Sequence, residues 1–167
     1  MLDRYVTQHG NSLTRLCLKL CRNDAEAEDL FQETWCRVVE KIRFYDESKP
    51  FEPWLFTLCI NSFRNSYKKA KNKPVAVFDS DEEQEFTINK AIDSKPVFNE
   101  EYDFLRQIIS ELDEKHRIVV VLHYFRDYSV KELASIIRIP QGTVKSRLHK
   151  AREIIKRRLE DDGKANL

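Results

Sequence analysis

The chain has 167 residues, 29 basic and 28 acidic side chains and a formal net charge of +1, a length that allows one domain or two small ones. No apolar run reaches the roughly 18 residues of a membrane span, no signal peptide is visible, and apolar residues recur at helical spacing, so we expect an all-α cytoplasmic protein without membrane insertion. Its four histidines are dispersed and no glycine-rich phosphate loop is present, so we expect no catalytic residues and no cofactor.

Charge divides the chain into three blocks. Residues 1–73 carry 13 basic and 10 acidic side chains, residues 74–104 carry 2 and 9, and residues 105–167 carry 14 and 9. This asymmetry predicts two weakly basic helical units joined by an acidic connector.

The first block is predicted to form three helices. They span roughly residues 2–22, 24–42 and 53–71. Asn23 or Asp24 is suited to cap the second helix, and Pro53 suits the first turn of the third. An aromatic and charged loop, residues 43–52, joins these two helices.

All four cysteines lie in this block: Cys17, Cys21, Cys36 and Cys59. Cys17 and Cys21 are four residues apart on one predicted helix, a spacing that can hold a metal ion. No CxxC motif or nearby histidine completes a zinc set. We therefore expect reduced, mostly buried thiols and no metal site.

The second predicted helix carries more apolar surface than one core face needs. Trp35 and Val39 lie to one side of the core face, beside Glu28 and Gln32. An aromatic residue rimmed by polar groups suggests a protein-binding face. The alternative is that Trp35 closes the edge of the core.

The third predicted helix has a polar stripe. Its members are Thr57, Asn61, Arg64, Asn65 and Lys68. Amides can pair with base edges and cations can hold phosphates, so the stripe suits a nucleic-acid strand. The alternative is a solvated helix face.

Residues 72–98 form the connector, which is acidic, bounded by Pro74 and Pro96, and without sustained periodicity. This composition predicts a flexible linker. Four apolar residues within it either dock on another surface or belong to a plain tether: Phe78, Phe86, Ile88 and Ile92.

The last block is predicted to form a four-helix domain that ends in a helix-turn-helix. Two helices, from about Asn99 to Leu112 and from Asp113 to about Phe125, come first. Ser129 followed by Glu132 has the capping-box pattern, and Pro140 cannot continue the helix that this cap begins. A short helix, a sharp break and a basic second helix are typical of a motif that places its second helix in a DNA major groove.

This last helix has two different faces. Its expected buried face consists of Val144, Leu148, Ala151, Ile155 and Leu159. The opposite face contains Ser146, His149, Lys150, Glu153 and Arg157, flanked by Thr143 and Lys145. Residues 142–160 carry seven basic and two acidic side chains, a surplus that favours phosphate. The alternative is a solvated basic helix in an ordinary bundle.

Together these segments resemble the extracytoplasmic-function (group IV) sigma factors of the sigma-70 family, the small promoter-specificity subunits of bacterial RNA polymerase. The stretches that carry the resemblance are D-A-E-A-E-D-L-F-Q-E-T-W (24–35), F-E-P-W-L-F-T-L-C-I-N-S-F-R-N-S-Y-K-K (51–69), L-D-E-K-H-R-I-V-V-V-L-H-Y-F (112–125) and P-Q-G-T-V-K-S-R-L-H-K-A-R (140–152). The resemblance implies a region 2 domain at 1–71, an acidic linker at 72–98, a region 4 domain at 99–161 and a tail at 162–167.

The resemblance also implies roles for particular residues. Core polymerase binding would fall to Asp29, Gln32, Glu33 and Trp35. The single-stranded "minus ten" element would be held by Phe44, Tyr45, Asn61, Arg64, Asn65 and Lys68. The "minus thirty-five" duplex would be read by Thr143, Lys145, Ser146, Arg147, His149 and Lys150. Implied partners are core RNA polymerase, promoter DNA and an anti-sigma factor, with the protein a monomer when free or 1:1 with its inhibitor.

Three positions depart from the family pattern. Arg138 lies in the turn where glycine is usual, so we expect a strained or altered turn. Ile60 replaces a common basic residue and Asn65 a common aspartate, which affects details of "minus ten" contact.

The rival hypotheses are a stand-alone helix-turn-helix regulator, which leaves Trp35 and the polar stripe unexplained, and a helical interaction protein without a DNA role.

Overall fold

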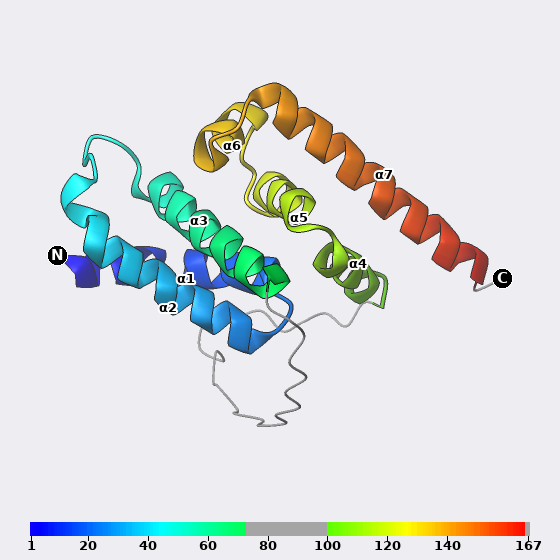
Figure 1. Ribbon diagram of the computed structural model, residues 1–167, viewed down its shortest axis with the longest axis horizontal. Helices are drawn as coiled ribbons and strands as arrows, with labels where there is room; N and C mark the ends of the chain where they lie inside the picture. Colours follow the sequence, from blue (N-terminus) through cyan, green and yellow to red (C-terminus); the bar gives the residue numbers. More distant parts are fainter. Residues whose placement is uncertain (73–99, 166–167) are drawn as a thin grey trace.

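The computed structural model describes residues 1–72 and 100–165, which form only helices and their connections (Figure 1). The elements are α1 (Leu2–Leu20), α2 (Asp24–Lys41), the 3₁₀ helix η1 (Ile42–Phe44), α3 (Phe51–Asn72), α4 (Glu100–Glu111), α5 (Glu114–Val120), the π-helix η2 (Val121–Phe125), α6 (Val130–Ile137) and α7 (Gln141–Ala165). The predicted all-α fold is confirmed for these residues. The predicted linker lies outside them, apart from Asn72, which ends α3.

Helices α1, α2 and α3 form the first domain, and their apolar stripes meet in its core. Fully buried members include Leu13, Leu16 and Leu20 from α1, Val38 from α2, and Leu55, Phe56 and Cys59 from α3. The predicted cap of α2 is Asn23, whose Oδ1 accepts a hydrogen bond from the Glu26 amide at 2.8 Å. Helix α1 ends at Leu20, earlier than expected, because Cys21 has extended backbone geometry.

Helices α4 to α7 form the second domain, and its helix-turn-helix has the predicted capping box. The Ser129 hydroxyl accepts a hydrogen bond from the Glu132 amide at 3.1 Å, and the Glu132 carboxylate accepts one from the Ser129 amide at 2.8 Å. The α6–α7 turn then passes through Arg138, which has left-handed backbone geometry with φ 57° and ψ 50°. The strained turn expected at this position is therefore present.

The expectation that the apolar face of α7 is buried along its whole length is wrong at its end. Leu159 is 42% exposed rather than buried, and Ile155 is only half-buried, because α7 outruns the helices that it packs against (Figure 1). Cys17 and Cys59 are buried as expected, but Cys36 is exposed on α2. A helical wheel shows on which face of a helix a residue lies. Whether another element covers that face depends on the tertiary structure.

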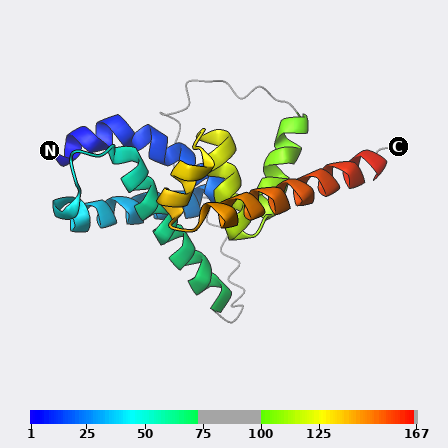
Figure 2. The same ribbon diagram turned by 90° about the horizontal axis from the view of Figure 1, so that it is seen from above.

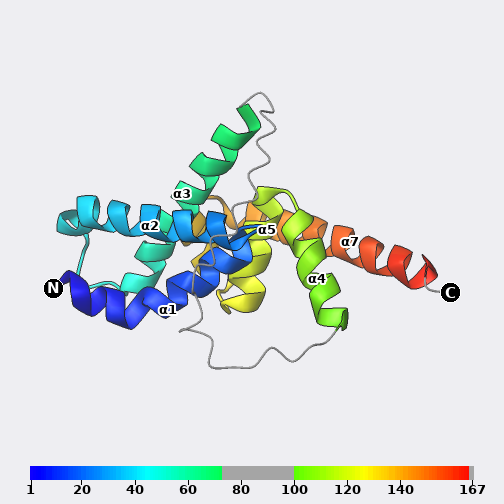
Figure 3. The same cartoon turned by 90° about the horizontal axis from the view of Figure 1, so that it is seen from below.

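The two domains pack against each other through α3, α5 and α6 and through α1 and η2 (Figures 1 and 2). Their buried apolar residues form one continuous core. The C-terminal halves of α3 and α7 project from this body in different directions (Figure 3). The inter-domain contact places α6, the first helix of the helix-turn-helix, beside α3.

Candidate nucleic-acid and protein interfaces

The predicted protein-binding face of α2 is exposed. Asp29, Gln32 and Glu33 all face solvent, and Trp35 is half-buried beside them. The Trp35 ring meets Phe31 edge-on with centroids 6.2 Å apart, and its buried indole N–H has no hydrogen-bond partner within the described residues. Indole N–H groups usually find an acceptor when they are buried. This face therefore combines exposed carboxylates and an amide with one unsatisfied aromatic donor.

The end of η1 exposes one aromatic ring, and the loop that follows it partly buries another. Phe44 is 73% exposed, and the Arg43 guanidinium lies 4.7 Å from its ring centroid. Tyr45 is half-buried, with ring centroids 4.9 Å from Trp54 and 5.3 Å from Phe51. Of the two predicted strand-binding aromatics, Phe44 is thus free to stack on a base, whereas Tyr45 forms part of the wall that supports the loop.

The predicted polar stripe of α3 divides into two groups. Asn61, Asn65 and Lys68 are exposed. Thr57 and Arg64 turn instead toward α6: the Thr57 hydroxyl lies 3.0 Å from the Ile136 carbonyl, and Arg64 Nη1 donates to the Ile137 carbonyl at 3.2 Å. These carbonyls lie in the last turn of α6, where a helix leaves its acceptors without internal donors. In this conformation Arg64 caps α6 instead of facing solvent.

A crevice of about 890 Å³ brings the acidic face of α2 next to the basic end of α3. Asp29 and Glu33 line it from one side, and Asn65 and Lys68 line it from the other. The residues predicted to bind polymerase and those predicted to bind a DNA strand therefore occupy adjoining surfaces of one small domain.

A polar cluster joins the two domains at the start of α3. We call it the Glu52 cluster, and its members are Ser12, Glu52, Arg126 and Tyr128. Arg126 Nη2 lies 2.9 Å from one Glu52 carboxylate oxygen, and the Tyr128 hydroxyl donates to the same oxygen at 3.0 Å. Burial opposes ionisation of Glu52, but hydrogen bonds from Arg126 and Tyr128, with the Arg126 charge and the Ser12 hydroxyl, outweigh it and lower the pKa of this carboxyl.

Arg117 of α5 is a second inter-domain contact and is only 1% exposed. Its guanidinium donates to the Leu20 carbonyl of α1 at 2.7 Å. It also donates to the carbonyls of Ile109, Ser110 and Leu112 around the end of α4. Burial is the main cause that lowers the pKa of this group. One buried cation thus satisfies the C-terminal carbonyls of helices from both domains.

The polar face of α7 is accessible. Lys145, Ser146, His149 and Lys150 are exposed, and Thr143 and Arg147 are half-buried. Val144 and Leu148 on the opposite side are buried, as predicted. Glu153 lies 3.4 Å from His149 Nε2 and 3.8 Å from Lys150 Nζ, so it offsets part of the positive charge of this face.

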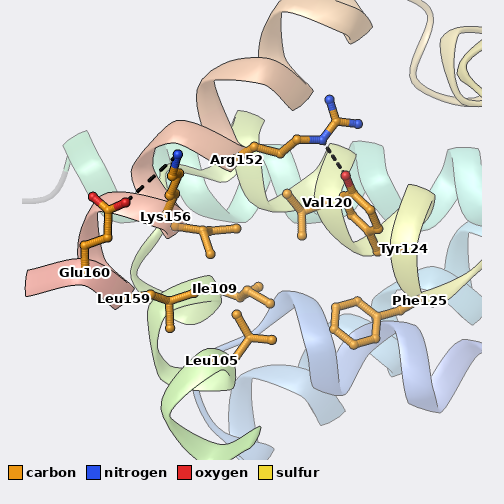
Figure 4. A pocket seen from close by; sticks show the side chains of 10 residues that line it. Leu105, Ile109, Val120, Tyr124, Phe125, Arg152, Lys156, Leu159 and Glu160 are labelled. Atoms are coloured by element: carbon orange, nitrogen blue, oxygen red, sulfur yellow. Dashed lines mark hydrogen bonds and ion pairs between the residues drawn. The ribbon is translucent and has the colours of Figure 1, made fainter. Parts of the chain in front are cut away.

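An apolar groove of about 550 Å³ lies between α4, η2 and the end of α7 (Figure 4). Leu105, Ile109, Phe125 and Leu159 point into it, and an ion pair between Lys156 and Glu160 stands at its rim. Sequence reasoning missed this groove. The sequence feature that could have revealed it is Leu159. This residue is the last apolar position of a stripe on α7 that extends past the helices packed against it.

Two of the four thiols lie close together in the core of the first domain. Cys17 and Cys59 lie with their sulfur atoms 4.0 Å apart, and their hydrogen bond, together with burial, raises the pKa of Cys17. Burial raises the pKa of Cys21 to about 12. Within residues 1–72 and 100–165 no three His, Cys, Asp or Glu side chains gather into a group that could hold a metal ion. In the same residues no helix is both long and apolar enough to traverse a bilayer.

Comparison with known proteins identifies both domains. Residues 5–73 match the family described as Sigma-70 region 2, and residues 105–155 match Sigma-70, region 4. The chain is 30% identical to the ECF RNA polymerase sigma factor SigW of Bacillus subtilis over 165 residues, covering 93% of this chain and 87% of that protein. It is 32% identical to SigM of the same organism over 155 residues, covering 93% of each chain.

Solved structures share the fold. The sigma factor RpoE in complex with the anti-sigma factor NepR from Bartonella quintana superposes with a TM-score of 0.69 at 20% identity, covering 95% of this chain and 96% of that one. CnrH in complex with the cytosolic domain of CnrY has a TM-score of 0.67 at 20% identity, covering 96% and 88%. The two family matches, their order and the full-length relatives agree: the chain belongs to the extracytoplasmic-function RNA polymerase sigma factors of the sigma-70 family.

Proposed function

We propose that this protein is a group IV sigma factor that binds core RNA polymerase through α2, holds the separated "minus ten" strand with α3 and its preceding loop, and reads the "minus thirty-five" duplex with α7. One observation carries the proposal: α3 and α7 each expose a polar, basic face suited to nucleic acid, and α2 exposes a separate face suited to binding a protein. A regulator that only binds duplex DNA needs the α7 face alone.

Each surface has a distinct task in this proposal. Asp29, Gln32, Glu33 and Trp35 contact polymerase. Phe44 stacks on an unpaired base while Asn61, Asn65 and Lys68 hold the strand, with Tyr45 supporting the loop and Arg64 joining once it leaves α6. Extruding a base from the duplex costs a few kcal/mol, which stacking and phosphate contacts offset. This division puts the domain boundaries near residues 71 and 99, with the helix-turn-helix in the second domain.

Recognition of the duplex falls to the exposed face of α7. Lys145, Ser146, His149 and Lys150 project from a helix whose opposite side is buried in the domain. A helix held in this way can enter the major groove, where side chains reach base edges. Thr143 and Arg147 flank this face and contact the phosphates.

The proposal includes an anti-sigma protein as a 1:1 inhibitor of the otherwise monomeric chain. Similar folds have been solved in complex with the anti-sigma factor NepR and with the cytosolic domain of CnrY. An inhibitor that covers the α2 face or the α3 stripe would prevent productive assembly with polymerase.

A pull-down of core RNA polymerase tests the proposal. We expect stoichiometric binding by the wild type and loss of binding in Gln32→Ala/Trp35→Ala, because both side chains belong to the α2 face. The matched control is Asn11→Ala/Arg15→Ala, which removes two exposed side chains from α1 and should bind normally. Since Trp35 is half-buried, helicity is checked by circular dichroism, and Gln32→Ala alone should weaken binding without affecting the core.

Failure of folded wild type to bind polymerase would overturn the proposal. Tight, sequence-specific duplex binding without polymerase would then support the stand-alone helix-turn-helix regulator. Equal loss of binding in the α1 control would show that the α2 face has no special role.

A further inference from the structure

His116 lies in the first turn of α5, the helix that packs against α7 (Figure 1). Its side chain is half-buried, and its buried Nδ1 atom has no hydrogen-bond partner within the described residues. The other ring nitrogen, Nε2, keeps access to solvent. A hydrogen bond to one ring nitrogen commonly fixes the tautomer of a histidine. No described residue fixes this ring in that way, so it is available to a group from outside the chain.

The charges around His116 are mostly positive. Burial is the largest influence on the ring and opposes its protonation. Three cations act in the same direction: Lys115, its neighbour in the chain, and Arg147 and Lys150 of α7. Asp113 is the carboxylate that favours protonation, but it does not outweigh them, and the pKa of His116 lies below its ordinary value of 6.5. In the free protein the ring is therefore neutral at pH 7.

The carboxylate of Glu114 does not compensate these cations at His116. Its charge acts on Arg64 of α3, which lies close enough to Arg147 of α7 to feel that charge as well. Helices α3, α5 and α7 thus meet around a cluster with more cations than carboxylates. Its cations are Arg64, Lys115, Arg147 and Lys150, and its carboxylates are Asp113 and Glu114. A cluster of this composition favours an anion such as phosphate.

This cluster continues into the face of α7 that the proposed function places on duplex DNA. Lys150 is exposed on that face, and Arg147 is half-buried at its edge. A duplex carries one phosphate charge for about every 1.7 Å of its axis, so it brings several phosphates to these cations. Phosphates offset the positive charge that keeps His116 neutral, and a protonated imidazole can donate from Nε2 to one of them.

We propose that His116 is a further phosphate-binding residue of the duplex interface and that it gains a proton when DNA binds. Binding that takes up a proton becomes stronger as the pH falls, by at most tenfold per pH unit for one proton. We expect about tenfold tighter binding at about pH 5.5 than at about pH 7.5. This inference rests on the proposed function for the position of the duplex, but it does not require polymerase.

Fluorescence anisotropy of the full chain with a labelled duplex of mixed sequence at low salt tests the proposal. The wild type should show the gain at low pH, whereas His116→Gln, which cannot take up the proton, should lose most of it. His149→Gln is the matched control, because Glu153 lies 3.4 Å from Nε2 of His149 and already favours its charged form without DNA. This control should keep the pH dependence. His116→Lys should bind tightly at both pH values, because its charge is permanent.

The salt dependence of the same binding distinguishes a phosphate contact from a change in fold. One additional phosphate contact steepens the slope of log K against log salt concentration by about 0.9. The wild type should therefore have a steeper slope at the lower pH, and His116→Gln should have the same slope at both. Circular dichroism at both pH values checks that helicity is unchanged.

Three results would overturn the proposal. They are an equal pH dependence in the wild type and His116→Gln, a wild-type salt slope that does not change with pH, and no duplex binding by the folded chain at the lower pH and low salt. Because polymerase takes no part in these measurements, a failed polymerase pull-down beside a normal pH response contradicts the proposed function alone.

Discussion

Arg138 has a backbone geometry that residues with a side chain rarely adopt. Its φ of 57° closes the turn between α6 and α7 and lets the Ile139 amide bond to the Ala134 carbonyl at 3.2 Å. This is the position after a helix where glycine is usual, because a β-carbon is strained in the left-handed region. Asp127, before α6, has the same φ, but aspartate tolerates this region better.

We predict that Arg138→Gly raises the free energy of unfolding by about 0.5–1 kcal/mol, since relief of backbone strain exceeds the added entropy of the unfolded chain. Urea denaturation followed by circular dichroism measures the change. Asp127→Gly serves as the control and should give a smaller gain. A decrease in stability at Arg138 would mean that its side chain makes a contact worth more than the strain.

At the level of elements, α7 has one face that packs in the domain core and an opposite face that is exposed for contact with DNA. Val144, Leu148 and Ala151 lock its first half into the domain. This fixes the direction of the exposed cations, so a substitution on the polar face should change DNA contact without disturbing the core. The end of the helix differs, because Leu159 lies over an open apolar groove.

We predict that Lys150→Glu abolishes promoter-specific transcription while leaving core polymerase binding intact. The substitution places a carboxylate where the proposed complex has a phosphate or base edge. Lys150 is exposed on α7, which lies apart from α2 (Figure 1). Run-off transcription and the polymerase pull-down are measured in parallel. Arg106→Glu makes the same charge change on α4 and should transcribe normally, whereas lost polymerase affinity in Lys150→Glu would contradict the assignment.

At the level of the whole molecule, the two domains are joined by charged and polar groups as well as by a continuous apolar core. Glu52 is ionised and paired where the two domains pack together, and it faces Arg126, Tyr128 and Ser12 there. Its pKa in that arrangement lies below the ordinary value of 4.5. Packing of the two domains is therefore linked to the loss of a proton from Glu52.

The sign of the pH effect follows from that direction. A lowered pKa means that Glu52 stabilises the packing of the two domains fully above pH 4.5 and progressively less as the pH falls through the lowered value. We predict that the radius of gyration, measured by small-angle X-ray scattering, increases as the pH is lowered below 4.5, because the two domains separate before helicity is lost. Glu52→Gln should already be expanded at neutral pH and should show no further change in this window; an identical response in both proteins would assign the effect to other carboxyl groups.

Sequence by itself determined the helices, the capping box, the turn at Arg138 and the family. Apolar periodicity, capping residues and the order of motifs can all be recognised in the sequence without knowing how the helices pack. It also placed Asn61, Asn65 and Lys68 on an exposed face of α3 and Lys145 and Lys150 on one of α7. Some boundaries differ from the expected ones by one or two residues, as at the end of α1 (Leu20) and the start of α3 (Phe51).

Only the tertiary structure decided which of those polar faces are free. Thr57 and Arg64 have the same spacing as the exposed members of their stripe, yet they bind α6, and Glu52 finds Arg126 across 74 residues of sequence. Leu159 likewise continues an apolar stripe but remains 42% exposed. The physical reason is that helical periodicity determines which residues share one face of a helix. Which other segment packs against that face depends on contacts between residues that are distant in the sequence.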